Sequence, residues 1–253
     1  MTVMKDHGLA TIILAAGKGT RMKSRKAKVL HTVGGKPMID YPVALSRQLG
    51  AERTVVVVGH QAAAVRNAVS DTEIVFAEQT EQWGTAHAVL QTEAALGDFS
   101  GVVLILCGDV PLLTAATVGQ LITVHRTTAA VITIMTARLD DPSGYGRIVT
   151  DHDGQVIKIV EDSDATPEEK QISEINTGIY CVNNPFLFSA IHAIENRNVQ
   201  GEYYLTDIVE IAVRRSLTVS SFVIEDPVEA MGINTVADLR HANAVLKSRH
   251  PTL

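Results

Sequence analysis

The sequence predicts an α/β protein in which a mainly parallel β-sheet lies between two layers of helices. Short continuous runs of Val, Ile and Leu, such as VVLILC at 102–107, are typical of strands that are buried on both faces. Helical patterns separate these runs through the first half of the chain. The chain has 253 residues, 46% of them hydrophobic, which is enough for a large core. We therefore expect a doubly wound, Rossmann-like three-layer α/β/α fold.

The first half alternates strands and helices in chain order. The run TVVVV at 54–58 reads as a fully buried strand, and the helix at 37–49 has proline in its first turn and apolar Met38, Tyr41 and Leu45 at helical spacing. The predicted strands are 9–14, 54–58, 73–76, 102–107 and 130–136, and the predicted helices are 37–49, 62–69, 84–96 and 114–127.

After about residue 140 the pattern becomes richer in β-structure. Residues 146–162 hold two β-prone segments around an Asp-Gly turn, which predicts a hairpin. No linker or internal repeat interrupts the chain, so we expect a single domain over 1–253. The other predicted strands are 175–182 and 218–224, the predicted helices are 184–196, 206–216 and 235–246, and 165–174 is a polar loop or short helix.

Composition excludes several classes of function. The net charge is −6, which argues against general nucleic-acid binding, where a basic surface should dominate. Cys107 and Cys181 lie far apart in apolar runs and read as buried free thiols, and the histidines show no zinc-ligand spacing. No apolar leader or membrane-spanning stretch is visible, so we expect a soluble, cytoplasmic protein without a membrane partner.

The stretch LAAGKGTRM follows the first predicted strand and is rich in small and cationic residues. It is neither a Walker A nor a GxGxxG sequence, but it has similar physical ingredients. Ala15, Ala16, Gly17 and Gly19 allow a ligand to approach the backbone, and Arg21 and Lys28 supply the positive charge that a triphosphate needs. The alternative is an ordinary glycine turn with solvated cations.

A second polar group precedes the helix predicted at 84–96. Gly84 and Thr85 place a hydroxyl and free N–H groups at a helix N-terminus, which suits an anion or a polar ligand edge. Gln79 and Gln82 each carry a donor and an acceptor and can read a nucleobase. A simple helix cap is the alternative.

Other polar residues follow later strands. Asp109 comes directly after the strand at 102–107, where a carboxylate is well placed to hold a divalent cation or to cap the next turn. Gly146 allows close backbone approach, Glu161 and Asn176 can bind hydroxyls, and Asn234 offers a carbonyl oxygen to a metal. Taken singly, residues such as Gly146, Glu161, Asn176 and Asn234 are more often structural than functional.

The sequence shows no Ser/His/Asp or Cys/His nucleophile motif. A phosphate-binding loop, cations and a metal-ligand candidate instead fit a reaction that proceeds by positioning and charge neutralisation. Phosphoryl and nucleotidyl transfer have that character.

The ordered motifs LAAGKGTRM, KVLH, GTAHAV, GDVPL, GYGRI, EINTGIY and GINT resemble one enzyme family over about residues 9–246. They are similar to the uridyltransferase domain of bifunctional N-acetylglucosamine-1-phosphate uridyltransferases/glucosamine-1-phosphate acetyltransferases. The resemblance implies a nucleotidyltransferase fold with a nucleotide-binding half at about 1–140 and a β-rich, sugar-phosphate-binding half at about 141–253. It also implies UDP-N-acetylglucosamine pyrophosphorylase activity with UTP, N-acetylglucosamine 1-phosphate and Mg²⁺, in cell-wall precursor biosynthesis.

The resemblance also assigns site residues. By it, the segment EYYLTD at 202–207 lines the sugar side. The implied roles are uridine and phosphate contacts for Leu14, Ala15, Ala16 and Gly17, triphosphate binding for Arg21 and Lys28, uracil recognition for Gln79, Gly84 and Thr85, Mg²⁺ binding for Asp109 and Asn234, and sugar-phosphate binding for Gly146, Glu161 and Asn176.

The chain departs from the family pattern at three points. Ala27 stands where the family usually has proline, and Cys107 where it often has tyrosine. The family's C-terminal hexapeptide repeats do not appear, so acetyl transfer is not predicted and a monomer or weak dimer is expected. A related nucleotidyltransferase using glucose 1-phosphate, dTTP or CTP is an alternative, as is a non-catalytic nucleotide-binding regulatory module.

Overall fold

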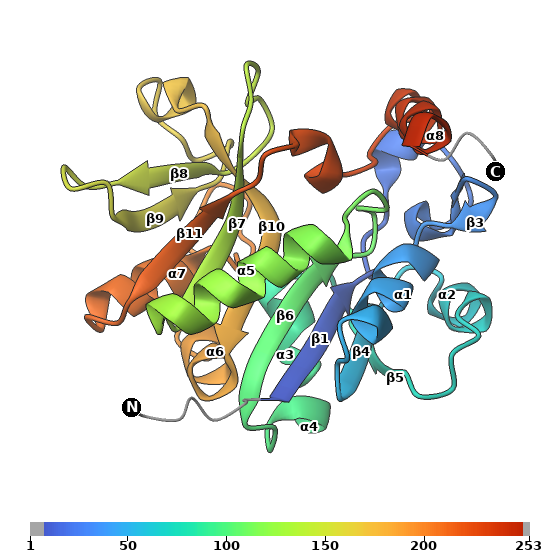
Figure 1. Cartoon of the computed structure of the whole chain (residues 1–253), viewed down its shortest axis with the longest axis horizontal. Helices are drawn as coiled ribbons and strands as arrows, with labels where there is room; N and C mark the ends of the chain where they lie inside the picture. The colour runs from blue at the N-terminus through green and yellow to red at the C-terminus, as the bar shows by residue number, and fades with distance from the viewer. Residues whose placement is uncertain (1–7, 250–253) are drawn as a thin grey trace.

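Nine β-strands form one twisted sheet in the computed structural model, which describes residues 8–249 (Figure 1). The strand order is β11-β7-β10-β6-β1-β4-β5, and the β8–β9 hairpin joins the sheet through a pairing of β8 with β10. The strands are β1 Gly8–Leu14, β4 Arg53–Val58, β5 Val75–Glu78, β6 Gly101–Cys107, β7 Ile132–Arg138, β8 Arg147–Thr150, β9 Val156–Val160, β10 Glu174–Asn183 and β11 Val219–Val223.

The centre of the sheet is parallel, as the sequence predicts. Strand β1 pairs in parallel with both β4 and β6, β4 pairs in parallel with β5, and β11 pairs in parallel with β7. Strand β10 is the exception, because it runs antiparallel to both β6 and β7. The predicted hairpin is present as the antiparallel pair β8–β9.

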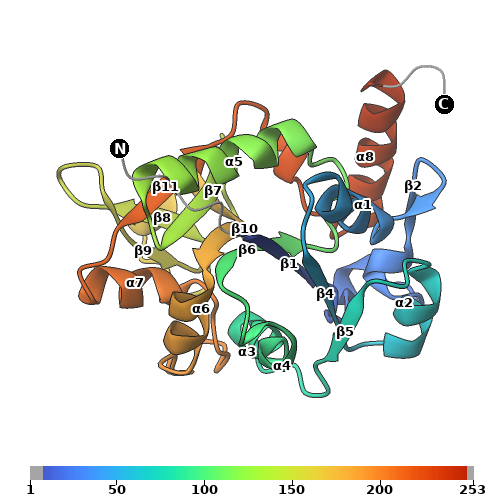
Figure 2. The same cartoon turned by 60° about the horizontal axis from the view of Figure 1, so that its bottom comes forward.

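Helices cover both faces of the sheet (Figure 2). Side chains that alternate along β1 enter opposite cores: Ala10 and Ile12 pack in the cluster that contains α3, α6 and α7, whereas Leu9 and Ile13 pack in the cluster that contains α1, α2 and α5. The helices are α1 Asp40–Gln48, α2 Ala62–Ala68, α3 Thr85–Leu90, α4 Glu93–Leu96, α5 Ala115–Thr128, α6 Asn184–Ile191, α7 Asp207–Arg214 and α8 Val236–Arg249.

Three predicted helices are wrong in extent. The helix expected at 37–49 begins only at Asp40, because Gly34 and Gly35 have φ of 56° and 81° and form the turn of a small hairpin of β2 Thr32–Val33 and β3 Lys36–Pro37. The helix expected at 84–96 is split into α3 and α4. The strand expected at 73–76 lies later, at β5, and the helix expected at 184–196 ends at Ile191.

The cysteines are free thiols, as expected. Cys181 is buried, but Cys107 is only half-buried, and its Sγ donates to the carbonyl oxygen of Gly178 at 3.6 Å. Within residues 8–249, no helix is both long and apolar enough to cross a membrane. Residues 1–7, where most of an N-terminal leader would lie, are outside the described residues.

Candidate active site

The loop after β1 forms the floor of the candidate site. Leu14 is half-buried, Ala15 and Ala16 are buried, and Gly17 is exposed. The N–H of Ala15 donates to the carbonyl oxygen of Val57 at 2.9 Å, which fixes the loop against β4. A side chain at Gly17 would meet nothing within 4 Å, so the space above this residue is open to a ligand.

Two cations and two oxygen-bearing side chains meet beside this loop. The Lys28 ammonium donates to Oδ2 of Asp109 in an ion pair and to Oδ1 of Asn234 at 3.1 Å. The Arg21 guanidinium donates to the same Asn234 oxygen at 2.9 Å. These residues are up to 213 positions apart in the chain, and the fold joins them at the carboxyl ends of β1 and β6. We call Arg21, Lys28, Asp109 and Asn234 the cation–oxygen cluster.

Gly19, predicted only as a small residue that lets a ligand approach, and Gln61, which was not predicted, hold Lys28 in place. Gly19 has a φ of 60°, and a side chain there would lie 2.6 Å from Cβ of Lys28, so only glycine fits. Gln61 clamps the loop just before Lys28, because its amide accepts from the N–H of Ala27 at 3.0 Å and donates to the carbonyl oxygen of Arg25. No motif in the sequence marks Gln61 for this role.

Asn234 is held by the start of α8. The Oδ2 atom of Asp238 accepts from the backbone N–H groups of Asn234 and Thr235 at 2.9 and 2.8 Å, and Oγ1 of Thr235 accepts from the Asp238 N–H. The side-chain amide of Asn234 donates to the carbonyl oxygen of Gly232 at 3.3 Å, which turns Oδ1 toward the cations. The spacing Thr-x-x-Asp is a capping-box pattern and could have identified Asp238.

Gln79, which is predicted to recognise the base, is only 4% exposed. Its amide nitrogen lies 3.0 Å from the carbonyl oxygen of Gly84 and 3.1 Å from Nδ1 of His87. The amide of Gln82 donates to the carbonyl oxygen of Ala16 at 3.0 Å and so ties this segment to the loop after β1. The structure therefore brings both predicted amides to the same edge of the sheet.

The N-terminus of α3 differs from the prediction of free N–H groups. The N–H of Ala86 donates to the carbonyl oxygen of Tyr203 at 2.9 Å, and the Thr85 hydroxyl accepts from the Leu205 N–H at 2.9 Å. Gly84 provides no side-chain cap, so the simple capping alternative is not observed either. Thr85 instead joins the first half of the chain to the segment at 202–207.

Three predicted sugar-side residues come together in the second half. The Asn176 N–H donates to the carbonyl oxygen of Gly146 at 2.8 Å, and a side chain at Gly146 would lie 3.6 Å from Oε2 of Glu161. Burial raises the pKa of Glu161, and the Thr206 hydroxyl donates to its Oε1 at 3.1 Å. The structure thus brings together a carboxylate and an amide, groups that can form hydrogen bonds with hydroxyls.

Asp207 gives a pH-dependent prediction. Burial, with Glu210 and Glu161 nearby, raises its pKa from 3.8 to about 6. Since the folded-state pKa is raised, the ionised carboxylate destabilises the fold above pH 6, and this cost disappears as the pH falls toward 4. Asp207→Asn should therefore increase the free energy of unfolding near pH ~8 by up to about 1 kcal/mol, after solvent screening of this half-buried group.

Urea denaturation between pH ~5 and ~8 measures this effect. The stability difference between Asp207→Asn and the wild type should shrink as the pH is lowered. Glu225→Gln, at an exposed position, is the matched control and should leave the profile unchanged. A pH-independent difference for Asp207→Asn would contradict the prediction.

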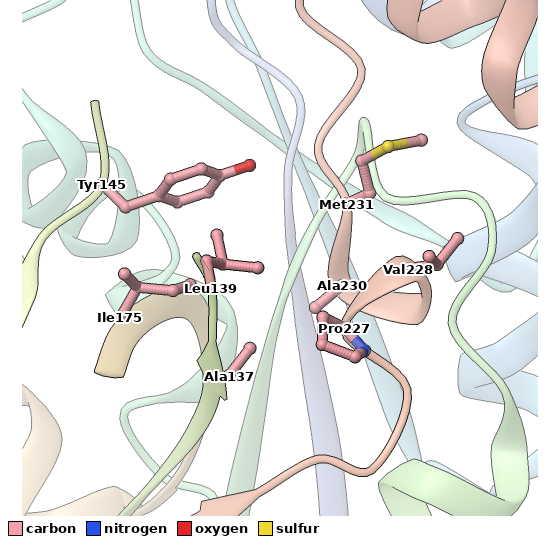
Figure 3. A pocket seen from close by; sticks show the side chains of 8 residues that line it. All are labelled: Ala137, Leu139, Tyr145, Ile175, Pro227, Val228, Ala230 and Met231. Atoms are coloured by element: carbon pink, nitrogen blue, oxygen red, sulfur yellow. The ribbon is translucent and has the colours of Figure 1, made fainter. Parts of the chain in front are cut away.

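An apolar cavity of about 140 Å³ lies between residues of β7 and β10 and the segment that leads to Asn234 (Figure 3). The ring of Tyr145 projects across it toward Met231. Burial raises the pKa of Tyr145, and the negative charges of Asp238 and Asp109 add to the effect. The lining residues are Ala137, Leu139, Tyr145, Ile175, Pro227, Val228, Ala230 and Met231.

A doubly wound sheet with a small-residue loop and converging cations at its carboxyl edge defines a nucleotide-handling α/β enzyme. The chain belongs to the nucleotidyl transferase family, whose model matches residues 10–228. It is 52% identical over 247 residues to the bifunctional protein GlmU of Geobacter sulfurreducens, covering 96% of this chain and 52% of that protein. The match to GlmU of Desulfotalea psychrophila is 46% identical over 97% of this chain and 72% of that protein.

The chain thus spans about half the length of the Geobacter relative. The resemblance expected from the motifs is confirmed. Solved structures of two other proteins share the fold. A UDP-glucose pyrophosphorylase complexed with UDP-glucose has a TM-score of 0.76 and 17% identity, and the match covers 96% of this chain and 100% of that one. A putative glucose-1-phosphate thymidylyltransferase from Bacillus anthracis has a TM-score of 0.72 and 22% identity, and the match covers 94% of this chain and 95% of that one.

Proposed function

We propose that this chain transfers a uridylyl group from UTP to N-acetylglucosamine 1-phosphate and releases pyrophosphate. The observation that supports this most is the cation–oxygen cluster, in which Lys28 contacts both Asp109 and Asn234 and Arg21 contacts Asn234. Such a cluster suits a reaction in which negative charge moves between phosphate groups. The choice of UTP and of the N-acetylated sugar rests on the sequence resemblance.

In the proposed reaction, an oxygen of the sugar phosphate forms a bond to the α-phosphorus of UTP. The bond from that phosphorus to the bridging oxygen of the β-phosphate breaks, and pyrophosphate leaves with the electron pair. A phosphate monoester has a second pKa of about 6, so it is largely dianionic at neutral pH and needs no general base. Arg21 and Lys28 stabilise the charge that develops on the leaving group.

Members of the nucleotidyl transferase family generally use a divalent metal. The Asp109 carboxylate and the Asn234 amide oxygen fit one, since both are hard oxygen ligands and both point at a single cation, the Lys28 ammonium. We propose that they hold Mg²⁺, which supplies charge neutralisation on the phosphates when bound. Within residues 8–249 no cluster of three or more His, Cys, Asp or Glu side chains could hold a metal, so substrate oxygens and water would complete the shell.

The sugar phosphate is proposed to bind in the second half of the chain. Glu161 and Asn176 orient the hydroxyl and amide groups of the sugar, and Gly146 leaves room for close approach. The base is proposed to lie over Gln79 and the start of α3. Because Thr85 bonds to Leu205, the two halves are proposed to act as a single domain around both substrates.

Pyrophosphate release tests this proposal. The value of kcat/KM with UTP and N-acetylglucosamine 1-phosphate should exceed that with glucose 1-phosphate, or with dTTP or CTP, by about tenfold or more. A higher value with another pair would contradict the assigned substrates. Tight UTP binding without turnover on any sugar phosphate would contradict the enzymatic assignment and support a regulatory module.

A further inference from the structure

The Lys28 ammonium contacts both of the oxygen atoms that are proposed to hold a divalent cation. It contacts Oδ2 of Asp109 and lies 3.1 Å from Oδ1 of Asn234. The Lys28 and Asp109 side chains are only 16% and 18% exposed, so this ion pair is largely shielded from water. Gly19 packs against the stem of Lys28 and keeps it over the two oxygens.

The Asn234 oxygen is also fully engaged. A carbonyl oxygen has two lone pairs, and Oδ1 of Asn234 accepts one hydrogen bond from Lys28 and one from Arg21, at 3.1 and 2.9 Å. The amide cannot rotate freely to offer another atom, because its nitrogen donates to the Gly232 carbonyl oxygen. A metal ion can therefore bind Oδ2 of Asp109 and Oδ1 of Asn234 together only if Lys28 moves away.

We propose that Lys28 is a built-in cation that exchanges with the divalent metal. Without ligands, Lys28 neutralises Asp109 and blocks the metal-binding oxygens. A triphosphate draws the ammonium of Lys28 and the guanidinium of Arg21 toward its own oxygens, which frees Asp109 and Asn234. Metal and nucleotide then bind cooperatively, and the free chain has low affinity for metal alone. The nucleotide part of this inference rests on the proposed function, whereas the competition between Lys28 and metal does not.

The exchange gives Lys28 substitutions two effects of opposite sign. Lys28→Met removes the competing charge, so metal alone should bind more tightly than to the wild type. The same change removes a phosphate-binding cation, so UTP should bind more weakly in EDTA. If Lys28 only bound phosphate and did not occupy the metal position, its loss would weaken UTP binding but leave the affinity for metal alone unchanged.

Titration with Mn²⁺ in the absence of nucleotide, with free Mn²⁺ followed by electron paramagnetic resonance, tests the inference. We expect Lys28→Met to bind Mn²⁺ about tenfold or more tightly than the wild type. Lys28→Gln, which keeps a hydrogen-bond donor without the charge, should change the affinity in the same direction. The Lys28→Met/Asp109→Asn double variant should lose the gain, since it lacks the carboxylate ligand.

Lys26→Met is the matched control, because Lys26 is an exposed cation in the same loop. It should leave the Mn²⁺ affinity within about twofold of the wild type, since exposed charges are well screened. An equal gain in Lys26→Met, or no gain in either folded Lys28 variant, would overturn the exchange.

Wild-type pyrophosphate release, assayed on the same preparations, separates this inference from the proposed function. If the wild type is active but the Lys28 variants bind Mn²⁺ no more tightly, the exchange fails and the function stands. If the Lys28 variants bind Mn²⁺ more tightly but the wild type has no activity, the function fails and the competition stands.

Discussion

Asp109→Ala is expected to slow pyrophosphate release from UTP and N-acetylglucosamine 1-phosphate by about 10³-fold in kcat. The substitution removes the only carboxylate of the cation–oxygen cluster, and with it the proposed metal ligand. It also leaves the Lys28 ammonium without its counter-ion at a largely buried position. Both effects act on the groups proposed to neutralise charge on the phosphates. A coupled pyrophosphate assay at saturating substrates measures the loss.

Asp109→Ala also carries a folding risk, because an unpaired, largely buried cation is costly. Asp109→Asn is therefore the second variant: it keeps the size of the side chain and an oxygen that accepts from Lys28, but removes the charge. It should stay folded in thermal unfolding and still lose about 10²-fold or more in kcat. Asp140→Ala, at an exposed position, is the control and should be fully active. Near-wild-type turnover of Asp109→Asn would remove Asp109 from the mechanism.

The buried parallel strands were predictable because each is a continuous apolar run that can be seen in the sequence. The run VVLILC at 102–107 is apolar at every position, and a strand covered on both faces buries Val102–Leu106. The direction of β10 was not predictable in this way. Its residues Ile179–Val182 are as buried as those of the neighbouring strands, and its antiparallel course follows from how the chain enters the sheet after the β8–β9 hairpin.

The errors at helix boundaries have local causes. Pro37 is compatible with the first turn of a helix, but the Gly34-Gly35 turn with positive φ places it in a short strand instead. The break between α3 and α4 lies at Gln91 and Thr92, where the Thr92 hydroxyl donates to the carbonyl oxygen of Val89 at 2.7 Å. A threonine inside an apolar helical pattern gives little warning of such a break.

The candidate site was predictable where a residue would touch a ligand and unpredictable where it holds another residue. Asp109 follows a buried strand, and that position alone marks it as a ligand candidate. Gln61 and Gly19 act through Lys28, and their partners are distant enough that only the fold reveals the contacts. Asp238 lies between these cases, since its capping-box spacing is visible in the sequence but its bond to Asn234 is not.

Gly84→Ala is expected to lower the free energy of unfolding by about 3 kcal/mol and to weaken UTP binding. Gly84 has a φ of 112°, which residues with side chains rarely adopt. An added Cβ would also lie 2.5 Å from the carbonyl oxygen and 2.8 Å from the nitrogen of Tyr203. Backbone cannot yield as a flexible side chain can, so the segment at 202–207 must move away from α3, and its bonds to Thr85 and Ala86 should be lost.

Gly119→Ala is the matched control. Gly119 lies inside α5, and a Cβ there would meet nothing within 4 Å, so alanine should stabilise the chain by about 0.5–1 kcal/mol. In thermal unfolding, Gly84→Ala should lower Tm by roughly 10 °C and Gly119→Ala should raise it slightly. The KM for UTP should rise only for Gly84→Ala. If Gly84→Ala unfolded within about 1 °C of the wild type and kept its KM, the contact between Gly84 and Tyr203 would not connect the two halves of the site.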